Sequence, residues 1–354
     1  MKIRDAFDGG CFLNLRKPKG LTSHDCVETV RQIIRNRRVG HCGTLDPFAE
    51  GVLPVAIGRA TRFIQYLRNE KEYTGCIRFG VTTATDDIDG YVIKPLPTRQ
   101  HTEHIDRDIL TERAIPWLSQ KSIAKALKNF VGDIEQIPPR VSAIKINGRR
   151  SYDLARRNMD VPLQARKVTI HQIQMLKFSP GDFPEAIVNV KCGGGTYIRS
   201  IARECGEILL HPYAVDPAGF QNEGGQAVGG ILASLLRQRS SNFDLESSIT
   251  LEALKAEWEL NSHNVSAIFS IEKAMEHLHK VELPSKLSAM YWKNHIVKFP
   301  IKLIQNGADT IHKPGYAVRI YSSSKPAQLL GVSPIEISSP ESVCLRKRLF
   351  LQNP

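Results

Sequence analysis

The 354-residue sequence contains no run of about 18 consecutive apolar residues, the minimum for a transmembrane helix. We therefore expect no membrane-spanning segment and no membrane partner. The first 15 residues carry two aspartates and two glycines before any apolar stretch develops, which matches neither a signal peptide nor an Arg/Ser-rich transit peptide. These absences predict a cytoplasmic protein.

Metal-ligand and nucleotide-binding spacings are also missing. The seven cysteines include no CxxC pair, and their odd number indicates reduced thiols rather than a disulfide framework. A structural zinc site is not expected for the same reason. No GxxxxGK[ST] segment occurs, which disfavours nucleotide hydrolysis.

Positive charge is abundant and unevenly spread. Lysine and arginine number 48 against 36 acidic residues, which gives a net charge of +12. Residues 16–72 hold 11 basic and 6 acidic residues, residues 140–167 hold 8 and 2, and residues 281–354 hold 10 and 4. Three basic blocks favour a nucleic acid contacted by several parts of the fold, although an incidental basic surface is the alternative.

Length and periodicity predict two domains of class α+β. The hydrophobic fraction of 42% is that of a folded protein, and 354 residues is the length of about two domains. We expect strands at 11–15, 73–81, 168–178 and 186–192, a helix capped by Thr22 or Ser23, and helices at 251–260 and 265–280. Residues 1–280 then form a mixed-sheet domain with insertions near 97–118 and 211–230, and residues 281–354 form a small β domain.

Two segments could carry chemistry. The loop between His41 and Pro54 surrounds Asp46 with small and turn-forming residues, so its carboxylate could act as nucleophile, base or metal ligand. Asp46 could equally stabilise a turn before Pro47. In the second segment three glycines precede a helix that contains Tyr197, able to stack on a base, and Arg199, able to pair with a carboxylate. A core tyrosine and a surface arginine are the alternatives.

Motifs across residues 10–210 closely resemble the TruB family of tRNA pseudouridine synthases. They follow one another in the family's order and carry the resemblance: Lys17-Pro18-x-Gly20, His41-Cys42-Gly43-Thr44-Leu45-Asp46-Pro47, Gly51-Val52-Leu53-Pro54, Ala60-Thr61-Arg62-Phe63, Lys71-x-Tyr73, Gly132-Asp133-Ile134, Ser142-Ala143-x-Lys145 and Gly195-Thr196-Tyr197-Ile198-Arg199-Ser200. The two insertions depart from the family pattern. Family members often end in a small PUA-type RNA-binding module, which residues 281–354 would form.

The resemblance implies isomerisation of uridine to pseudouridine at T-loop position 55 of tRNA. This reaction exchanges an N1–C1′ bond for a C5–C1′ bond, so no cofactor and no metal are expected. By the same match Asp46 is the catalytic residue, Tyr73 stacks on the base and is placed to move the C5 proton, and Arg199 pairs with Asp46. Whether Asp46 attacks the sugar or the base stays open.

The resemblance also suggests how RNA is held. The target base must leave its stack, and His41 matches the histidine that fills the resulting gap. Further RNA contacts are expected from the side chains Lys17, Lys19, Arg37, Arg38, Arg62 and Tyr197. We expect a monomer whose partner is tRNA. A guide-RNA-dependent or non-catalytic RNA-binding protein of the same fold is the alternative, but Asp46, Tyr73 and Arg199 together, and the absence of a long basic tail, favour a stand-alone enzyme.

Overall fold

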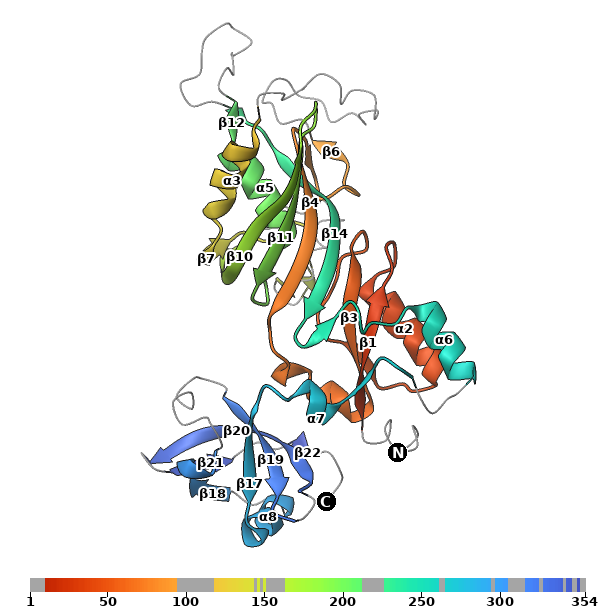
Figure 1. The fold of residues 1–354 in the computed structure, drawn as a ribbon, viewed down its shortest axis with the longest axis vertical. Coiled ribbons are helices and arrows are strands. Elements are labelled where there is room, and N and C mark those ends of the chain that lie inside the picture. Colours follow the sequence, from red (N-terminus) through yellow and green to blue (C-terminus); the bar gives the residue numbers. More distant parts are fainter. Residues whose placement is uncertain are drawn as a thin grey trace, which may run out of the picture.

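A ten-stranded and a six-stranded sheet, with three two-stranded sheets beside them, make up the described part of the structure, a computed structural model (Figure 1). It describes residues 10–93, 118–142, 145–146, 149–150, 163–211, 226–260, 265–293, 297–304, 316–324, 327–339, 342–345 and 349–350. The predicted insertion at 97–118 lies outside these ranges except for Leu118, and the insertion at 211–230 lies outside them over residues 212–225.

A mixed ten-stranded sheet forms the larger part, with the strand order β16-β1-β3-β14-β4-β11-β10-β7, while β2 pairs with β3 and β15 with β14. Its strands are β1 (Cys11–Lys17), β2 (Val39–His41), β3 (Glu50–Ile57), β4 (Lys71–Phe79), β7 (Gly132–Gln136), β10 (Arg166–Ser179), β11 (Glu185–Cys192), β14 (Gly230–Ser240), β15 (Phe243–Asp244) and β16 (Ile268–Ser270). Most pairs are antiparallel, but β3 and β14 pair in parallel over only two positions. That short junction joins the two halves of the sheet.

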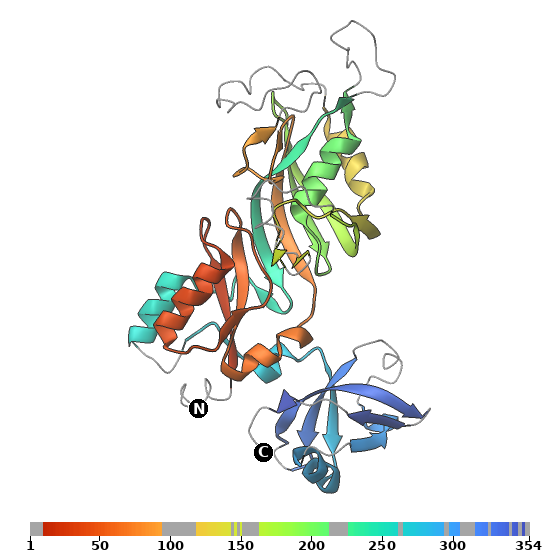
Figure 2. The same ribbon diagram turned by 180° about the vertical axis from the view of Figure 1, so that it is seen from behind.

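Two pairs of helices cover the halves of this sheet (Figures 1 and 2). In one half α2 (Ser23–Ile34) packs beside α6 (Leu251–Leu260), and in the other α3 (Gln120–Lys128) packs beside α5 (Ile198–Ile208). Thr22 caps α2 as predicted, since its hydroxyl accepts from the Asp25 N–H and the Asp25 carboxylate accepts from the Thr22 N–H. Each half has its own buried apolar cluster.

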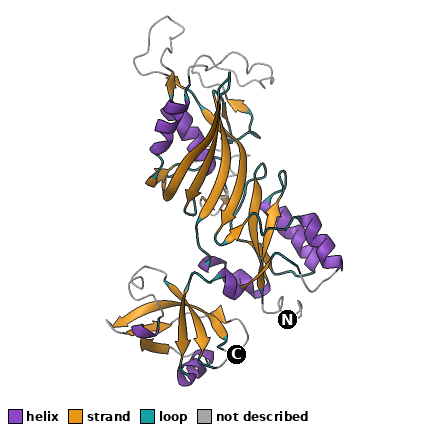
Figure 3. Cartoon of the chain, viewed as in Figure 1, coloured by secondary structure: helices purple, strands orange, loops and turns teal. Residues whose placement is uncertain are grey.

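The C-terminal sheet has six strands in the order β17-β19-β20-β21-β18, with β22 paired to β20. Strands (orange) dominate this part of the chain, with short helices (purple) beside them (Figure 3). Its elements are β17 (His279–Leu283), α8 (Ser285–Trp292), β18 (Val297–Pro300), η4 (Ile301–Leu303), β19 (Ala317–Ser322), β20 (Leu329–Ser339), β21 (Ser342–Leu345) and β22 (Leu349–Phe350). The fold is thus the predicted α+β class with a small C-terminal β module. Its main buried cluster is separate from the two clusters under the helix pairs, whereas Ala317 and Val332 belong to a further cluster shared with Phe12 of the large sheet.

Short elements complete the chain. They are η1 (Gly58–Arg62), η2 (Ile64–Tyr66), β5 (Thr82–Thr83), β6 (Val92–Ile93), β8 (Lys145–Ile146), β9 (Arg149–Arg150), β12 (Leu210–His211), β13 (Gln226–Ala227) and α7 (Ile271–Ala274). The helix predicted for 265–280 is wrong, because β16, α7 and the start of β17 occupy these residues. No described helix is both long and apolar enough to cross a membrane.

Candidate active site

Asp46 lies on the loop between β2 and β3, beside the junction of the two half-sheets. The loop is braced from α2: the Ser23 hydroxyl donates to the Leu45 carbonyl (2.9 Å) and accepts from the Leu45 N–H (2.8 Å). A backbone N–H at Ala49 also donates to the Asp46 carbonyl at 3.1 Å. These bonds hold the Asp46 backbone, while its side chain keeps 30% of its surface exposed.

A second brace comes from Arg237 on β14, whose side chain is fully buried. Its guanidinium donates to the carbonyls of Gly43 (3.2 Å), Thr44 (3.3 Å) and Val52 (2.6 Å). Gly51 makes this packing possible, because its φ of +109° is left-handed and a Cβ there would meet the Arg237 carbonyl oxygen at 2.3 Å. One arginine therefore ties both ends of the Asp46 loop to the centre of the sheet.

Arg199, on the first turn of α5, forms an ion pair with Asp46. Its Nη2 donates to Asp46 Oδ1 at 2.9 Å, and its Nε lies 2.9 Å from Asp46 Oδ2. Only 4% of the Arg199 side chain is exposed. Contact with both carboxylate oxygens orients the Asp46 side chain as well as attracting it. The structure thus brings together the predicted pair, although 153 residues separate them.

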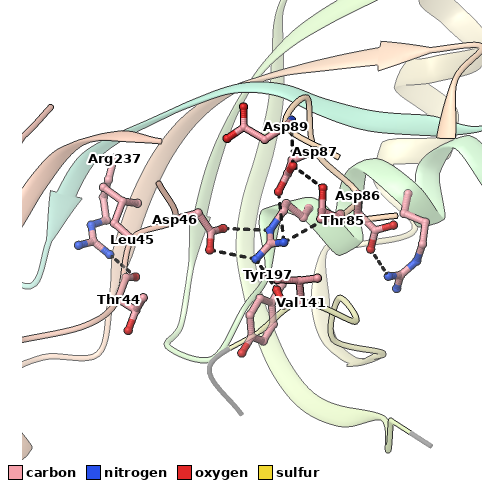
Figure 4. A network of polar contacts seen from close by, with 12 residues as sticks. Thr44, Leu45, Asp46, Thr85, Asp86, Asp87, Asp89, Val141, Tyr197 and Arg237 are labelled. Carbon is pink, nitrogen blue, oxygen red and sulfur yellow. Dashed lines mark hydrogen bonds and ion pairs between the residues drawn. The ribbon is translucent and has the colours of Figure 1, made fainter. Parts of the chain in front are cut away.

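The Arg199 guanidinium has three further acceptors, on Asp87, Thr85 and Val141, and Figure 4 labels these three residues. Its Nη1 lies 3.2 Å from Asp87 Oδ2 and donates to the Thr85 carbonyl (2.9 Å), while Nη2 donates to the Val141 carbonyl (3.0 Å). Asp87 is itself oriented by the Thr85 hydroxyl at 2.5 Å. Burial raises the pKa of the Asp87 carboxyl, and the Thr85 hydroxyl and Arg199 oppose that rise.

Tyr73 and Tyr197 lie near the same carboxylate. Tyr73, on β4, is 6% exposed and stands opposite Arg237 in the β4–β14 ladder. Burial raises the pKa of both phenols, and the negative charge of Asp46 adds to each rise. The Gln136 side chain holds the Tyr197 backbone, accepting from its N–H at 2.8 Å and donating to its carbonyl at 3.0 Å.

Lys17 does not face solvent as a phosphate-binding lysine would. It is fully buried, and its Nζ donates to the carbonyls of Leu21 (2.6 Å), Pro18 (2.8 Å) and Pro47 (3.2 Å). Burial lowers the pKa of its ammonium to about 8. The RNA-contact role predicted for Lys17 is therefore replaced by a bracing role at the end of the Asp46 loop.

The other predicted RNA contacts are more accessible. Lys19, Arg37, Arg38 and Arg62 are exposed, while His41, the last residue of β2, is half-buried. Within the described ranges, no group of three or more His, Cys, Asp or Glu side chains could hold a metal ion.

Comparison with known proteins places the chain in a family. Residues 31–198 match the family described as TruB family pseudouridylate synthase (N terminal domain). The chain is 41% identical over 281 residues to tRNA pseudouridine synthase B of Trichormus variabilis (strain ATCC 29413 / PCC 7937), an alignment covering 79% of this chain and 83% of that protein. The chain belongs to the TruB family. A second member, tRNA pseudouridine synthase B of Synechocystis sp. (strain ATCC 27184 / PCC 6803 / Kazusa), is 37% identical over 91% of this chain and 93% of its own length.

Solved structures agree on the fold. The crystal structure of a Cbf5-Nop10-Gar1 complex contains a chain that matches with a TM-score of 0.67 and 24% identity, covering 99% of this chain and 88% of that one. At this identity the likeness supports the TruB fold alone. It extends over the six-stranded C-terminal sheet as well as the large sheet, because nearly the whole chain is aligned.

Several side chains of this TruB site were not predicted from sequence. Arg237 carries no local motif, and Gln136 belongs to the family motif Gly132-Asp133-Ile134-x-Gln136, which by itself gave its side chain no role; both act through partners far along the chain. Asp86 and Asp87 belong to an acidic stretch, TDDIDG, which alone reads as a solvated turn. Several carboxylates directly after a predicted strand could have indicated ion pairs with buried arginines, because a buried arginine needs such partners.

Proposed function

We propose that this chain isomerises uridine to pseudouridine in tRNA, at position 55 of the T loop, as a stand-alone cytoplasmic monomer. One observation carries the proposal: a partly exposed carboxylate, Asp46, is held through both oxygens by a buried arginine in a chain of the TruB family. The relatives named tRNA pseudouridine synthase B support tRNA as the substrate.

The proposed roles follow from position. Asp46 acts at the glycosidic bond, either on the sugar or on the base, and Arg199 orients its carboxylate. Tyr73 stacks on the extruded uracil and is placed to move the C5 proton, which C5 must lose and N1 must gain once C5 has bonded to C1′. His41 fills the space that the uracil leaves in the RNA stack, since extrusion costs a few kcal/mol of lost stacking and pairing. Each role rests on the family match together with the placement described above.

RNA would be held by exposed cations. Lys19, Arg37, Arg38 and Arg62 are the proposed phosphate contacts, and Tyr197 contributes at the rim of the site. These side chains come from the turn after β1, the loop after α2 and the short helix after β3, all near the Asp46 loop in the chain. Such a spread suits a large curved polyanion.

The decisive experiment measures tritium release from C5-labelled uridine in tRNA transcripts, with the purified chain and no added RNA or protein. We expect close to one tritium per tRNA, and none from a transcript with cytidine at position 55. Release only after a guide RNA is added would favour the guide-dependent alternative. Tight binding of tRNA without release under either condition would favour a non-catalytic RNA-binding protein.

A further inference from the structure

Helix α5 directs two arginines, four residues apart, at two consecutive aspartates. Arg199 contacts Asp87 at 3.2 Å, and Arg203 Nη1 contacts Asp86 Oδ2 at 2.6 Å. Residues i and i+4 lie one above the other on a helix face. The turn that carries both aspartates is therefore held by two adjacent helical turns, of which only the first also reaches Asp46.

The same two arginines hold a second segment. Arg203 Nη2 donates to the Ile137 carbonyl at 2.7 Å, and Arg199 Nη2 donates to the Val141 carbonyl at 3.0 Å. Ser200, between them on α5, adds a hydroxyl bond to the Ile137 carbonyl at 2.8 Å. Two segments therefore orient the Arg199 guanidinium: the acidic turn, residues 85–87, and the segment after β7, residues 137–141. We call them the two walls of the site, and Arg203 is bonded to both.

We propose that Arg203 is a positioning residue for the Asp46–Arg199 pair. Its ion pair with Asp86 and its bond to Ile137 hold the Thr85 carbonyl, the Asp87 carboxylate and the Val141 carbonyl where Arg199 needs them. Arg203 acts through Arg199, because its own guanidinium is bonded to Asp86, Glu204 and the Ile137 carbonyl and not to Asp46. The inference rests on the proposed function for its kinetic consequence, but its structural consequence can be measured without any activity.

Local energetics explain why the turn needs this restraint. Asp86 has a left-handed φ of 61°, a conformation that costs energy in a residue with a Cβ. Its side chain is only 14% exposed, and the Arg203 side chain is 19% exposed. Burial raises the pKa of the Asp86 carboxyl and Arg203 opposes the rise. Without Arg203 the turn would hold a strained, poorly solvated and unpaired carboxylate, which it can relieve by moving.

The competing reading is that the Arg203–Asp86 pair only adds stability. A matched control exists in the same sheet, where Arg78 on β4 pairs with Glu185 on β11 at 2.7 Å, with side chains 38% and 33% exposed. Among the described residues, the Arg78–Glu185 pair has no bond to the acidic turn or to the segment after β7. Arg78→Met therefore removes a cross-strand ion pair while leaving the surroundings of Arg199 unchanged.

The kinetic test uses the full-length chain and compares Arg203→Met, Arg203→Lys, Asp86→Asn and Arg78→Met under single-turnover conditions. We expect Arg203→Met to slow conversion at saturating enzyme by about 10- to 100-fold, the effect of misplacing a catalytic group by about 1 Å. The dissociation constant for tRNA should change less than about threefold, because the Arg203 guanidinium is already bonded to Asp86, Glu204 and the Ile137 carbonyl. Arg203→Lys should recover part of the rate, and Arg78→Met should stay within about twofold of the wild type.

A second measurement keeps the proposal testable if activity is absent. Amide hydrogen exchange in the peptides covering residues 83–90 and 136–142 should accelerate in Arg203→Met and Asp86→Asn, but not in Arg78→Met. A wild-type chain that makes no pseudouridine would refute the proposed function and leave this readout intact. Unchanged exchange in both peptides, or equal single-turnover rates in Arg203→Met and Arg78→Met, would overturn the proposal for Arg203.

Discussion

At the scale of single residues, Asp46 offers the sharpest separation between chemistry and structure. Asp46→Asn keeps a turn-forming side chain that can still accept a hydrogen bond from Arg199, but it loses the charge. Arg199 retains Asp87 and the carbonyls of Thr85 and Val141, so we expect the free energy of unfolding to fall by no more than about 1–2 kcal/mol. Pseudouridine formation should fall by about a thousandfold or more, and tRNA affinity should stay nearly constant.

Tritium release and filter binding on the same preparation check this prediction. Glu50→Gln is the matched control, since Glu50 is an exposed carboxylate at the start of β3, four residues from Asp46. If Asp46→Asn kept a substantial part of the wild-type turnover, Asp46 could not be the catalytic residue.

Lys17 gives a prediction that depends on pH. An unfolded lysine keeps its proton until about pH 10.4, whereas the buried Lys17 releases its proton near pH 8. Between these values the unfolded state binds more protons, so this residue's contribution to the free energy of unfolding rises with pH. The gain should be about 2 kcal/mol between pH 8 and 10.

Urea unfolding of the wild type and of Lys17→Met over this pH range isolates the effect, because the titration of the other groups cancels in the difference. A difference that stays constant from pH 8 to 10 would mean that Lys17 remains charged in the folded protein.

Contiguous sequence motifs predicted the pairing of single residues correctly, but the prediction failed for a residue whose bonding partners come together only on folding. Asp46 and Arg199 were predicted as a pair, and their ion pair is present. Their catalytic roles stay predictions. Lys17 was predicted at the RNA surface, but its ammonium is bonded to the nearby Pro18 and Leu21 carbonyls and to the Pro47 carbonyl, which lies 30 residues along the chain.

At the scale of elements, Gly51 tests the junction between β3 and β14. Gly51→Ala places a methyl group 2.3 Å from the Arg237 carbonyl oxygen in a left-handed conformation. The two strands must separate or lose their parallel pairing, so we expect a loss of about 3 kcal/mol or more in the free energy of unfolding.

Gly20→Ala is the control, because Gly20 also has a left-handed φ, +92°, but no atom lies within 4 Å of the added methyl group. Its cost should be about 1 kcal/mol, from backbone strain alone. Equal urea midpoints for the two variants would show that the β3–β14 contact is not tight.

Element prediction failed at two places for one physical reason. The apolar spacing of residues 265–280 fits a helix, but Ile268 and Phe269 pair with β1 and leave room only for the four-residue α7. No element was predicted for residues 230–240, yet they form β14, the strand between β3 and β4. Both segments contain residues that occur in helices as well as in strands, so pairing with distant strands decides which secondary structure forms. Strands with clear alternation, such as β4 and β11, were predicted correctly.

At the scale of the whole molecule, the proposed tRNA complex should be strongly salt-dependent. Each neutralised phosphate releases counterions, so the logarithm of the affinity falls linearly with the logarithm of the salt concentration. Removing both exposed cations in Arg37→Ala/Arg38→Ala should make the slope shallower by about 1–2. Lys273→Ala, which removes a lysine already paired with Glu276 at 2.6 Å, should leave the slope unchanged. A nearly flat plot for the wild type would contradict polyanion binding.

The C-terminal module is packed against the larger part of the molecule. Ala317 and Val332 belong to the same buried cluster as Phe12 and Phe63 of the large domain. Polar contacts accompany this packing: the Tyr321 hydroxyl donates to Glu272 at 2.6 Å, and Arg319 Nε donates to the Leu278 carbonyl at 2.9 Å. Since β17 begins at His279 and pairs with β19, a cut after Leu278 removes the small sheet without dividing it.

We expect this truncated chain to stay folded, because the clusters under its two helix pairs contain no buried residue beyond Ala267, and the cluster shared with the module loses only Ala317 and Val332 of its buried residues. It should lose affinity, as roughly two to four phosphate contacts would go, and should need higher tRNA concentrations. Turnover at saturating tRNA should persist, because the module would bind ground and transition states equally. The control is Ala317→Ser, which disturbs the shared cluster while keeping the module. A truncated protein that unfolds cooperatively yet is inactive at saturating tRNA would show instead that the module braces the catalytic site.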